Sequence, residues 1–575
     1  MSAARLFSLI LLLLLMIRNG PLTRAQGESL VGWLPADFEG YVRIETANRR
    51  QAIEELNFAA FIGAFLQPAR ASFDASLTYN DFFPLDSFDV EGASFTTHVL
   101  PWLGDELLVG YQTLDNRLRV DTESWVLIIA SQDAFQAAST LGPVLRGQDF
   151  LETDTHRGVT VYRGDRLAFA FLPSAVVIGP EALVYAVIEV QAGEGPTLSD
   201  DPIYREVAAA LPQHSPITGF LRGEAAAASL SLLLSAGDSA APLLAAVGNA
   251  VEALNGAVTT ETVLLRGAVE AVGLAVQPNA VLLNDVRASV VVKLAETPAS
   301  STAVLDMRVL DFIPRSAMLV HVGPQARDAL QIALVGGPLV NFSSRLLGAF
   351  PVRETAAVAS GLIAPPTERD LLRGVEGLSA VLFSQLGIVL HDELLVPLDG
   401  SYAFALLPRP NDPLPLLNTS YDLLFVTQTD AGASWIERVE RVIGAFVDDV
   451  VFLADRRDDL ELVTIAASNS DEAIARLATG DGMLIVGTGD AALTAWAAGR
   501  GDNQLLNTER WQRLSGDRPP ALYVDVNGLY NIAFPSAGGP VNRPVNQVAL
   551  YGRSLSSELY ALEARVVVSG LASPR

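Results

Sequence analysis

The pentapeptide Asp-Glu-Leu-Leu-Val occurs twice in the chain, at Asp105–Val109 and again at Asp392–Val396. Five common residues alone prove little, but the segments around them also match in the same order. Each copy opens with a proline-led strand, at Leu34-Pro35 in the first and at Ile313-Pro314 in the second. The sequence therefore predicts an internal duplication in which the two copies carry different loop insertions.

Beyond the pentapeptide, both copies continue with the same succession of strands and helices. A strand that begins at Ser124 or Ser420 leads into a predicted helix, at Asp133–Leu145 in the first copy and Ala433–Val447 in the second. Each copy ends with two long strands of alternating polarity. The separation of matching positions drifts rather than scatters: it is 279 residues from Pro35 to Pro314, 287 from Asp105 to Asp392, and 308 from Gly179 to Gly487.

These matches place copy 1 at residues 30–296, a small, polar, proline-bearing linker at 297–307, and copy 2 at 308–572. The terminal strand pairs are joined by short turns such as Gln277-Pro278-Asn279, which predicts antiparallel hairpins. Helices are too few for a regular alternation with strands. The expected fold class is α+β: two tandem copies of one domain, each an antiparallel sheet with helices packed on one face. Two unrelated domains with chance matches are the alternative.

The N-terminus has the pattern of a secretory signal peptide over residues 1–25. A basic start at Met1–Arg5 precedes the apolar run Leu6–Ile17, and a small-residue cleavage site ends at Ala25. A bilayer span needs about 20 apolar residues, so the run is short for a permanent anchor, although an uncleaved anchor is the alternative. The expected location is extracytoplasmic, secreted or in the cell envelope, with no membrane span beyond this segment.

Composition excludes some functions and constrains others. The chain has no cysteine, so it has neither disulfides nor a lipid-modified cysteine anchor. The net charge is -26 and Lys293 is the only lysine, which argues against nucleic acid as a partner because binding depends on cations that neutralise phosphates. Half of the residues are hydrophobic (50%) and only 18% are charged. Such a chain needs large cores or an apolar cavity.

One turn resembles a phosphate-binding loop. Gly487-Thr488-Gly489-Asp490 follows an apolar strand and precedes a helix, which is the context that a dinucleotide site requires. The first copy has Gly179-Pro180-Glu181 at the matching turn, so proline replaces the second glycine. A carboxylate in the first helical turn would also repel phosphate. The favoured interpretation is a tight turn, with Thr488 as a candidate helix cap.

No other motif predicts catalysis or metal binding. The histidines are too far apart in sequence for one helix or hairpin to bring two together. A run of aspartates flanks Arg456 and Arg457 without the calcium-loop pattern, and is expected to be a solvated connection between a helix and a strand. Asp105-Glu106 and the matching pair Asp392-Glu393 are expected to stand at a strand start in both copies, which favours a structural role. No catalytic, cofactor-binding or metal-binding residue is predicted, and no cofactor. The residues considered are His98, His156, His214, His321, His391, Asp448, Asp449, Asp455, Asp458 and Asp459.

The segments that define the repeat resemble the uncharacterised, exported bacterial proteins of domain-of-unknown-function family 3352. The signatures are Leu34-Pro35-Ala36-Asp37, Trp102-Leu103-Gly104-Asp105-Glu106, Val177-Ile178-Gly179 and Leu198-Ser199-Asp200. The second copy departs from them, with Ser316 in place of the opening aspartate and His391 in place of the glycine. The resemblance implies an envelope location and no catalytic residues.

Three functions remain open at this point. The first is a non-enzymatic binding or scaffold module of the envelope, with an unknown protein as partner. The second is a carrier of a hydrophobic ligand or lipid, which the Ala-Leu-rich segments near 225–254 and 362–390 would favour. The third is an envelope hydrolase, for which converging titratable groups would be required. The sequence does not decide whether the protein is an enzyme, and the absence of catalytic motifs argues against an enzyme.

Overall fold

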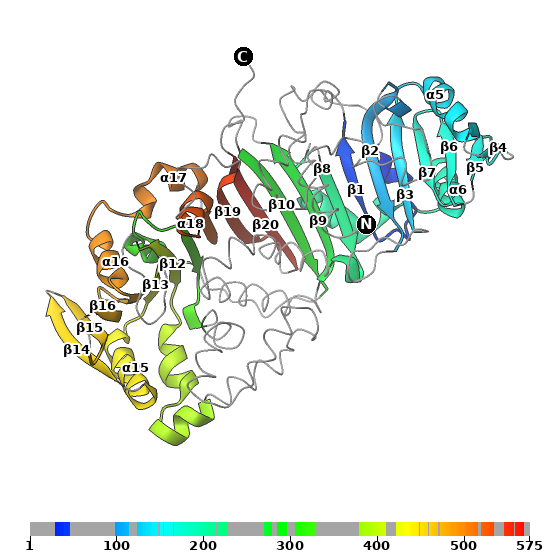
Figure 1. Cartoon of the computed structure of the whole chain (residues 1–575). Helices are drawn as coiled ribbons and strands as arrows, with labels where there is room; N and C mark the ends of the chain where they lie inside the picture. Colours follow the sequence, from blue (N-terminus) through cyan, green and yellow to red (C-terminus); the bar gives the residue numbers. More distant parts are fainter. Residues whose placement is uncertain are drawn as a thin grey trace, which may run out of the picture.

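The structure is a computed structural model that describes two halves of the chain in detail (Figure 1). The described residues are 29–46, 98–99, 101–113, 124–147, 150–152, 155–226, 269–278, 285–295, 305–330, 379–409, 421–533 and 545–568, without 165, 214, 216, 328–329, 448, 458, 470–471, 516–518 and 557. The predicted signal peptide, most of the predicted linker, His214, Asp448, Asp458 and most of the Ala-Leu-rich segments lie outside them.

Within the described residues, the first half is built around ten antiparallel strands. Following the pairings across the sheet, their order is β4-β5-β6-β7-β3-β2-β1-β8-β9-β10. Its elements are η1 (Leu30–Trp33), β1 (Gly40–Glu45), β2 (Leu103–Tyr111), β3 (Trp125–Ser131), α5 (Ala134–Gly147), β4 (Leu151–Glu152), β5 (Val161–Arg163), β6 (Ala168–Leu172), β7 (Ala175–Gly179), α6 (Glu181–Gln191), η5 (Leu198–Asp200), α7 (Pro202–Ala210), β8 (Ile217–Arg222), β9 (Val269–Pro278) and β10 (Asp285–Leu294).

The second half repeats this order with strands β14-β15-β16-β17-β13-β12-β11-β18-β19-β20. Its elements are η7 (Met307–Phe312), β11 (Leu319–Gly323), η8 (Leu390–Leu395), η9 (Val396–Leu398), β12 (Tyr402–Pro408), β13 (Tyr421–Gln428), α15 (Gly432–Phe446), β14 (Val450–Arg457), β15 (Leu460–Ala467), β16 (Ala473–Gly480), β17 (Met483–Thr488), α16 (Ala491–Gly499), η10 (Leu505–Asn507), α17 (Glu509–Ser515), β18 (Leu522–Asp525), α18 (Val526–Ala533), β19 (Val545–Ser554) and β20 (Leu559–Val568).

The halves also share a detail of backbone bonding at their proline-led openings. Leu198 N–H donates to the carbonyl of Leu34 at 2.8 Å, and Leu505 N–H donates to the carbonyl of Ile313 at the same distance. Isolated bridges join Pro35 to Thr197 and Pro314 to Gln504. The short helices η5 and η10 are thereby attached to the openings in the same way.

The two halves join edge to edge through their last strands. β10 runs antiparallel to β20, from the pair Asp285↔Val567 to the pair Lys293↔Leu559, so one hydrogen-bonded sheet passes from one half into the other. Figure 1 shows β9, β10, β20 and β19 side by side in the middle of the molecule. The terminal hairpins β9–β10 and β19–β20, which the alternating strands predicted, form this junction.

The α+β class and the antiparallel sheet are confirmed, but the helices are not confined to one face. In the first half, α5 packs on the face that carries Leu127 and Ile129, whereas α6 packs on the face that carries Val126 and Ile128. The second half has α15 and α16 on opposite faces in the same manner. Because strands β3 and β7 carry apolar side chains on both faces, a helix must pack on each face to keep those side chains from water.

The repeated pentapeptide adopts two conformations, so the expected strand in the second copy is wrong. Asp105–Val109 lies within strand β2, whereas Asp392 lies in the helical segment η8. Gly110 follows the first copy, and a side chain there would meet Leu34 at 2.6 Å. Pro397 stands at the matching place in the second copy. Proline cannot donate to a central ladder, and β12 takes the place of β2 beside β11 and β13.

Within the described residues, no single helix is long and apolar enough to cross a membrane. Two consecutive helical segments meet that length and composition only as a pair, and they are bent by 94° relative to each other. They are Ser379–Leu386 and Leu390–Leu398. This segment packs against α15 through Leu382, Leu390 and Leu394.

Candidate functional site

The glycine-rich turn that the sequence singles out connects β17 to α16. A side chain at Gly487 would place its Cβ 2.5 Å from the backbone nitrogen of Ala492, so the strand and the helix meet too closely for any residue but glycine. Gly489 has φ +53°, in the left-handed region, and its backbone N–H donates to the carbonyl of Ile474 at 3.0 Å. Both glycines are therefore explained by the turn itself.

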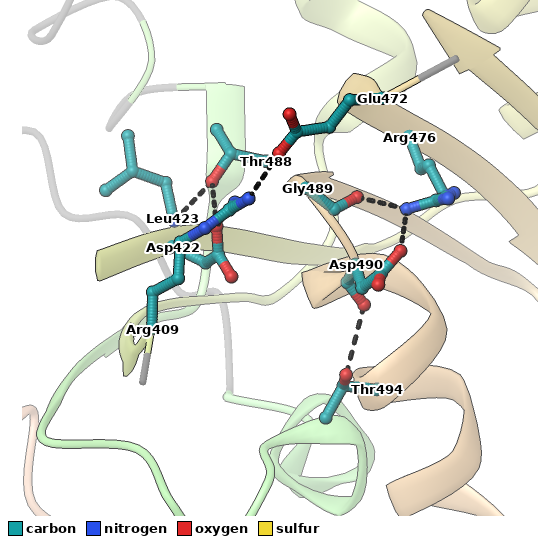
Figure 2. A network of polar contacts seen from close by, with 9 residues as sticks. All are labelled: Arg409, Asp422, Leu423, Glu472, Arg476, Thr488, Gly489, Asp490 and Thr494. Carbon is teal, nitrogen blue, oxygen red and sulfur yellow. Dashed lines mark hydrogen bonds and ion pairs between the residues drawn. The ribbon is translucent and has the colours of Figure 1, made fainter. Parts of the chain in front are cut away.

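Arginine and carboxylate side chains enclose this turn on one side (Figure 2). Arg409 lies 3.1 Å from Asp422 and 2.8 Å from Glu472. Arg409 and Asp422 are largely buried, with exposed side-chain fractions of 16% and 14%. Burial raises the pKa of Asp422, although the nearby Arg409 opposes the shift. The charge of Arg409 is thus already shared between two carboxylates.

A second arginine closes the turn from the other side. Arg476 on β16 donates to the carbonyl of Gly489 at 2.5 Å and forms an ion pair with Asp490 (Figure 2). Thr494 donates to the carbonyl of Asp490 one turn along the helix, at 3.0 Å. The N-terminus of α16 therefore has a paired carboxylate beside it, where a bound phosphate would have to lie.

The expected cap at Thr488 is wrong, because this side chain points to the neighbouring strand instead. Its hydroxyl accepts a hydrogen bond from the backbone N–H of Leu423 at 2.9 Å and donates to Asp422 at 3.2 Å. The residue at the start of α16 is Asp490, which makes no capping bond with its side chain. Thr488 thus ties β17 to β13.

The matching turn in the first half is built for the same purpose. A side chain at Gly179 would meet the carbonyl oxygen of Trp125 at 2.8 Å. Glu181, in the first turn of α6, lies 3.0 Å from Arg163 and accepts a hydrogen bond from Tyr185 at 2.9 Å. In both halves an arginine neutralises the acid that begins the helix. The arrangement stabilises a strand-to-helix turn and presents no anion site.

The glutamates of the repeated pentapeptide have corresponding partners despite the different backbones around them. Glu106 accepts hydrogen bonds from the backbone N–H of Leu30 and the hydroxyl of Ser29, both at 3.1 Å, and lies 2.9 Å from Arg43. Glu393 accepts a hydrogen bond from the backbone N–H of Val389 at 3.0 Å. It also lies 3.1 Å from Arg438 on α15.

The partners of Glu393 also favour its charged form. The backbone N–H of Val389, and after it Arg438, lowers the pKa of Glu393. Each glutamate holds a neighbouring segment in place: Glu106 holds η1 and Glu393 holds the start of η8. The neighbouring Asp105 is exposed. These contacts give the motif a role in folding.

The aspartate-rich segment is not the connection between a helix and a strand that the sequence predicted. Asp455 and Arg456 lie inside strand β14, which pairs with β15 over its full length. Asp449 stands just before the strand in a left-handed conformation, with φ +62°. Asp459 pairs with Arg500, which also lies 3.3 Å from Asp481. The segment is a strand with charged flanks.

The four histidines in the described part of the chain lie in different segments. His156 stacks on Tyr185 with ring centroids 4.3 Å apart and lies 3.2 Å from Glu189. His391 lies in η8, and the carbonyl of His98 accepts a hydrogen bond from Trp102. No group of three metal-ligating side chains occurs among the residues described.

His321 is the histidine that the fold changes most. It lies on the central strand β11, and the hydroxyl of Tyr402 is 3.2 Å from its Nδ1. Burial lowers the pKa of His321 from 6.5 to about 4. The side chain is therefore neutral in the folded protein over a range where a free imidazole would carry a proton.

We expect His321 to make the protein acid-sensitive. The unfolded chain binds a proton at this side chain below pH 6.5, whereas the folded chain binds it only near pH 4. The free energy of unfolding therefore falls as the pH is lowered from 6.5 to about 4. The loss is about 2 kcal/mol after allowance for partial exposure. The variant His321→Gln, which keeps a partner for Tyr402, should lose less stability over that interval in urea unfolding at stepped pH. Equal losses in both proteins would contradict this assignment.

Lys293 lies at the junction of the halves, and sequence reasoning did not assign it a role. Its side chain on β10 is 2.7 Å from Glu558, in the β19–β20 turn, and 3.0 Å from Glu206 on α7. The backbone N–H of Leu294 donates to the carbonyl of Glu558 at 2.8 Å. The hydrogen bond to Glu558 is the largest of the effects that raise the pKa of Lys293. A lone lysine in an arginine-rich chain is the signal that could have identified it.

The protein has an α+β fold in which two halves with the same strand order share one sheet. In the part of the chain that the structure describes, its polar clusters stabilise turns and junctions. The chain belongs to a family described as a protein of unknown function, DUF3352, whose model matches residues 81–443. This is the family that the sequence signatures indicate.

Other comparisons are distant. No curated protein matches the sequence significantly. Crystal form I of TP0453 is similar with 10% identity and a TM-score of 0.25, over 48% of this chain and 82% of that one. Crystal form III has 9% identity and a TM-score of 0.26, over 48% and 84%. These TM-scores define neither a shared fold nor a shared function.

Proposed function

We propose that this protein is an extracytoplasmic module of the cell envelope that binds or scaffolds a partner and catalyses no reaction. The observation that carries the proposal is the use of its buried charges. Arg409, Arg476, Glu106 and Lys293 are each engaged by partners that join one segment to another. Active sites instead concentrate titratable groups that converge on a substrate.

Two further features support a binding role. Residues 1–25 have the pattern of an export signal, which supports an envelope location. Its two halves follow one strand order, and we propose that they are two copies of one module. A duplicated module presents two related surfaces on one continuous sheet. Such a surface suits a partner that is itself extended or repeated.

The experiment is native mass spectrometry of the chain purified gently from its own host, combined with protease treatment of intact cells. The chain should be digested by protease added outside the cytoplasmic membrane while a cytoplasmic marker stays intact. The native mass should show a complex with another protein that survives solvent extraction of lipid. A chain protected with the cytoplasmic marker, or one that turns over simple ester or phosphate substrates, would contradict the proposal.

A carrier of hydrophobic ligands is a second candidate, and one observation favours it. Apolar side chains in the middle of the sheet are only partly buried against the core beneath them. They come from three strands of both halves, namely Leu221 on β8, Val290 on β10, and Tyr560 and Leu562 on β20. For this candidate the native mass should include a lipid in fixed proportion, and that mass should disappear on solvent extraction.

A further inference from the structure

Matching positions in the two halves can be followed from the proline-led openings to the junction. The openings correspond because η5 and η10 are bonded to them in the same way. The same number of residues further on, Gly40 begins β1 and Leu319 begins β11. Followed through the pairings of β8, β9 and β10 and of their counterparts β18, β19 and β20, Val292 then matches Val566.

The junction places matching positions of β10 and β20 opposite each other. Ser289 matches Glu563, and these two residues are a pair in the middle of the ladder. Pairs on either side of them come in matched sets. Val292 lies opposite Tyr560, and the positions that match these two, on β20 and β10, also lie opposite each other. Each strand therefore offers its neighbour the same edge in the same register.

Helices α7 and α17 lie on one face of the joined sheet. Lys293 on β10 reaches Glu206 on α7, and Arg565 on β20 donates to the carbonyl of Leu514 on α17 at 3.1 Å. Both side chains point to the same face of the ladder, because residues two apart on a strand, and residues opposite each other, share a face. Half a turn about an axis normal to the sheet, through the central pair, therefore relates the two halves.

Two like halves can share a sheet in two ways. In a head-to-tail contact the last strand of one half pairs with the opposite edge of the other, which here is β14, and the series of contacts stays open. In this protein the last strand pairs with the last strand. This is the arrangement of a symmetric dimer, and it is closed, because each edge is occupied by the other.

Apolar side chains support the ladder on both faces. Leu559 of the second half belongs to the core of the first half, together with Val291. On the other face Val292 lies in one cluster with Tyr560 and Leu562. Separation of the halves would expose these side chains and leave the backbone groups along one side of each strand unpaired. The contact thus combines a backbone ladder with apolar packing, as a stable subunit interface does.

We infer that the β10–β20 junction is a symmetric dimer interface enclosed within one chain. The partner that the last strand of each half recognises is a second copy of the same module, and the segment between the halves contributes by raising their effective concentration. This inference rests on the two-copy proposal above and needs neither export nor an envelope partner. It has two consequences: the order of the halves can be exchanged, and the halves stay together when the segment between them is cut.

The two-fold relation fixes the design of a chain with exchanged halves. Leu294 at the end of β10 matches Val568 at the end of β20, and Leu30 in η1 matches Val309 in η7. The fourteen residues that connect Leu294 to Val309 should therefore also connect Val568 to Leu30. The exchanged chain consists, in order, of residues 309–568, 295–308 and 30–294.

A disulfide shows whether the exchanged chain rebuilds the junction. Ser289→Cys with Glu563→Cys should link within the exchanged chain as in the native order, and Ser289→Cys with Ala561→Cys should link in neither. An exchanged chain that has the native circular dichroism spectrum but does not link, beside a native-order chain that does, would overturn the symmetric interface. That outcome would leave the proposed function untouched.

Cleavage of the folded full-length chain tests the second consequence without a change of order. A protease site inserted between Ser300 and Ser301 should, once cut, leave the two halves sedimenting together down to about 1 µM. Leu562→Arg puts a charge among the apolar side chains of the junction and should raise the concentration at which the cut halves separate at least about tenfold. The matched control is Phe135→Arg on α5, where the side chain is 83% exposed, and it should leave that concentration unchanged. Wild-type halves that separate as soon as they are cut, or a control that separates as readily as the Leu562 variant, would overturn the inference.

Discussion

Replacement of Lys293 by methionine is expected to lower the free energy of unfolding by about 2–3 kcal/mol. The lysine is 8% exposed and connects Glu206 of the first half to Glu558 of the second. Its loss removes the cation that lies between two carboxylates at the junction. Removing one member of a buried ion pair costs about 3–5 kcal/mol, and the partial exposure of both glutamates reduces that figure. Urea unfolding at neutral pH measures the change.

The control for this prediction is Lys293→Arg, which keeps the charge and should recover most of the lost stability. The pH dependence gives a second readout. The folded chain holds the Lys293 proton more tightly than the unfolded chain, whose pKa is 10.5. The contribution is therefore complete below pH 10.5 and is lost as the pH rises further. The methionine variant should lack this alkaline loss. If both proteins lose stability equally above pH 10.5, Lys293 does not hold the junction.

A change of similar size is expected for Glu106→Ala, which should cost about 3 kcal/mol of unfolding free energy. The variant leaves the backbone N–H of Leu30 without its acceptor and Arg43 without its carboxylate in a largely buried place. An unsatisfied buried donor costs about 1–3 kcal/mol, and loss of a charged partner adds to it. Thermal and urea unfolding both report the change.

The neighbouring Asp105 provides the matched control, because it belongs to the same motif and is exposed. Asp105→Ala should change the unfolding free energy by less than about 0.5 kcal/mol. Glu393→Ala should fall between the two, since Glu393 has similar partners but its side chain is 31% exposed. An Asp105 variant as unstable as the Glu106 variant would show that the motif acts through something other than the Glu106 contacts.

Much of the fold could be predicted from the sequence, because its strands carry strong local patterns. The hairpins β9–β10 and β19–β20, strand β3 with helix α5, and strand β13 with helix α15 all lie where alternation and apolar runs predicted them. The helices on both faces could have been predicted as well. Strands such as Ala175–Gly179 are buried at every position, and a strand that is apolar throughout needs cover on both sides.

Other features were not predicted because they depend on one residue next to a motif or on long-range contacts. Identical Asp-Glu-Leu-Leu-Val segments form a strand and a helix, and the residue that separates them, Gly110 against Pro397, lies just outside the motif. Thr488 bonds to β13, which is 65 residues away, and does not cap the helix next to it. Lys293 meets Glu558 only because β10 lies beside β20, and no periodicity in either strand indicates that pairing.

The central claim is that the two halves share one sheet through β10 and β20, and a single cross-link tests it most directly. Ser289 lies opposite Glu563 in this junction, and Ala561 lies two residues away from that position. The double variant Ser289→Cys, Glu563→Cys should form an intramolecular disulfide in dilute solution, whereas Ser289→Cys, Ala561→Cys should not. A failure of the first pair to link, or equal linking of both pairs, would show that the halves are not joined in this register.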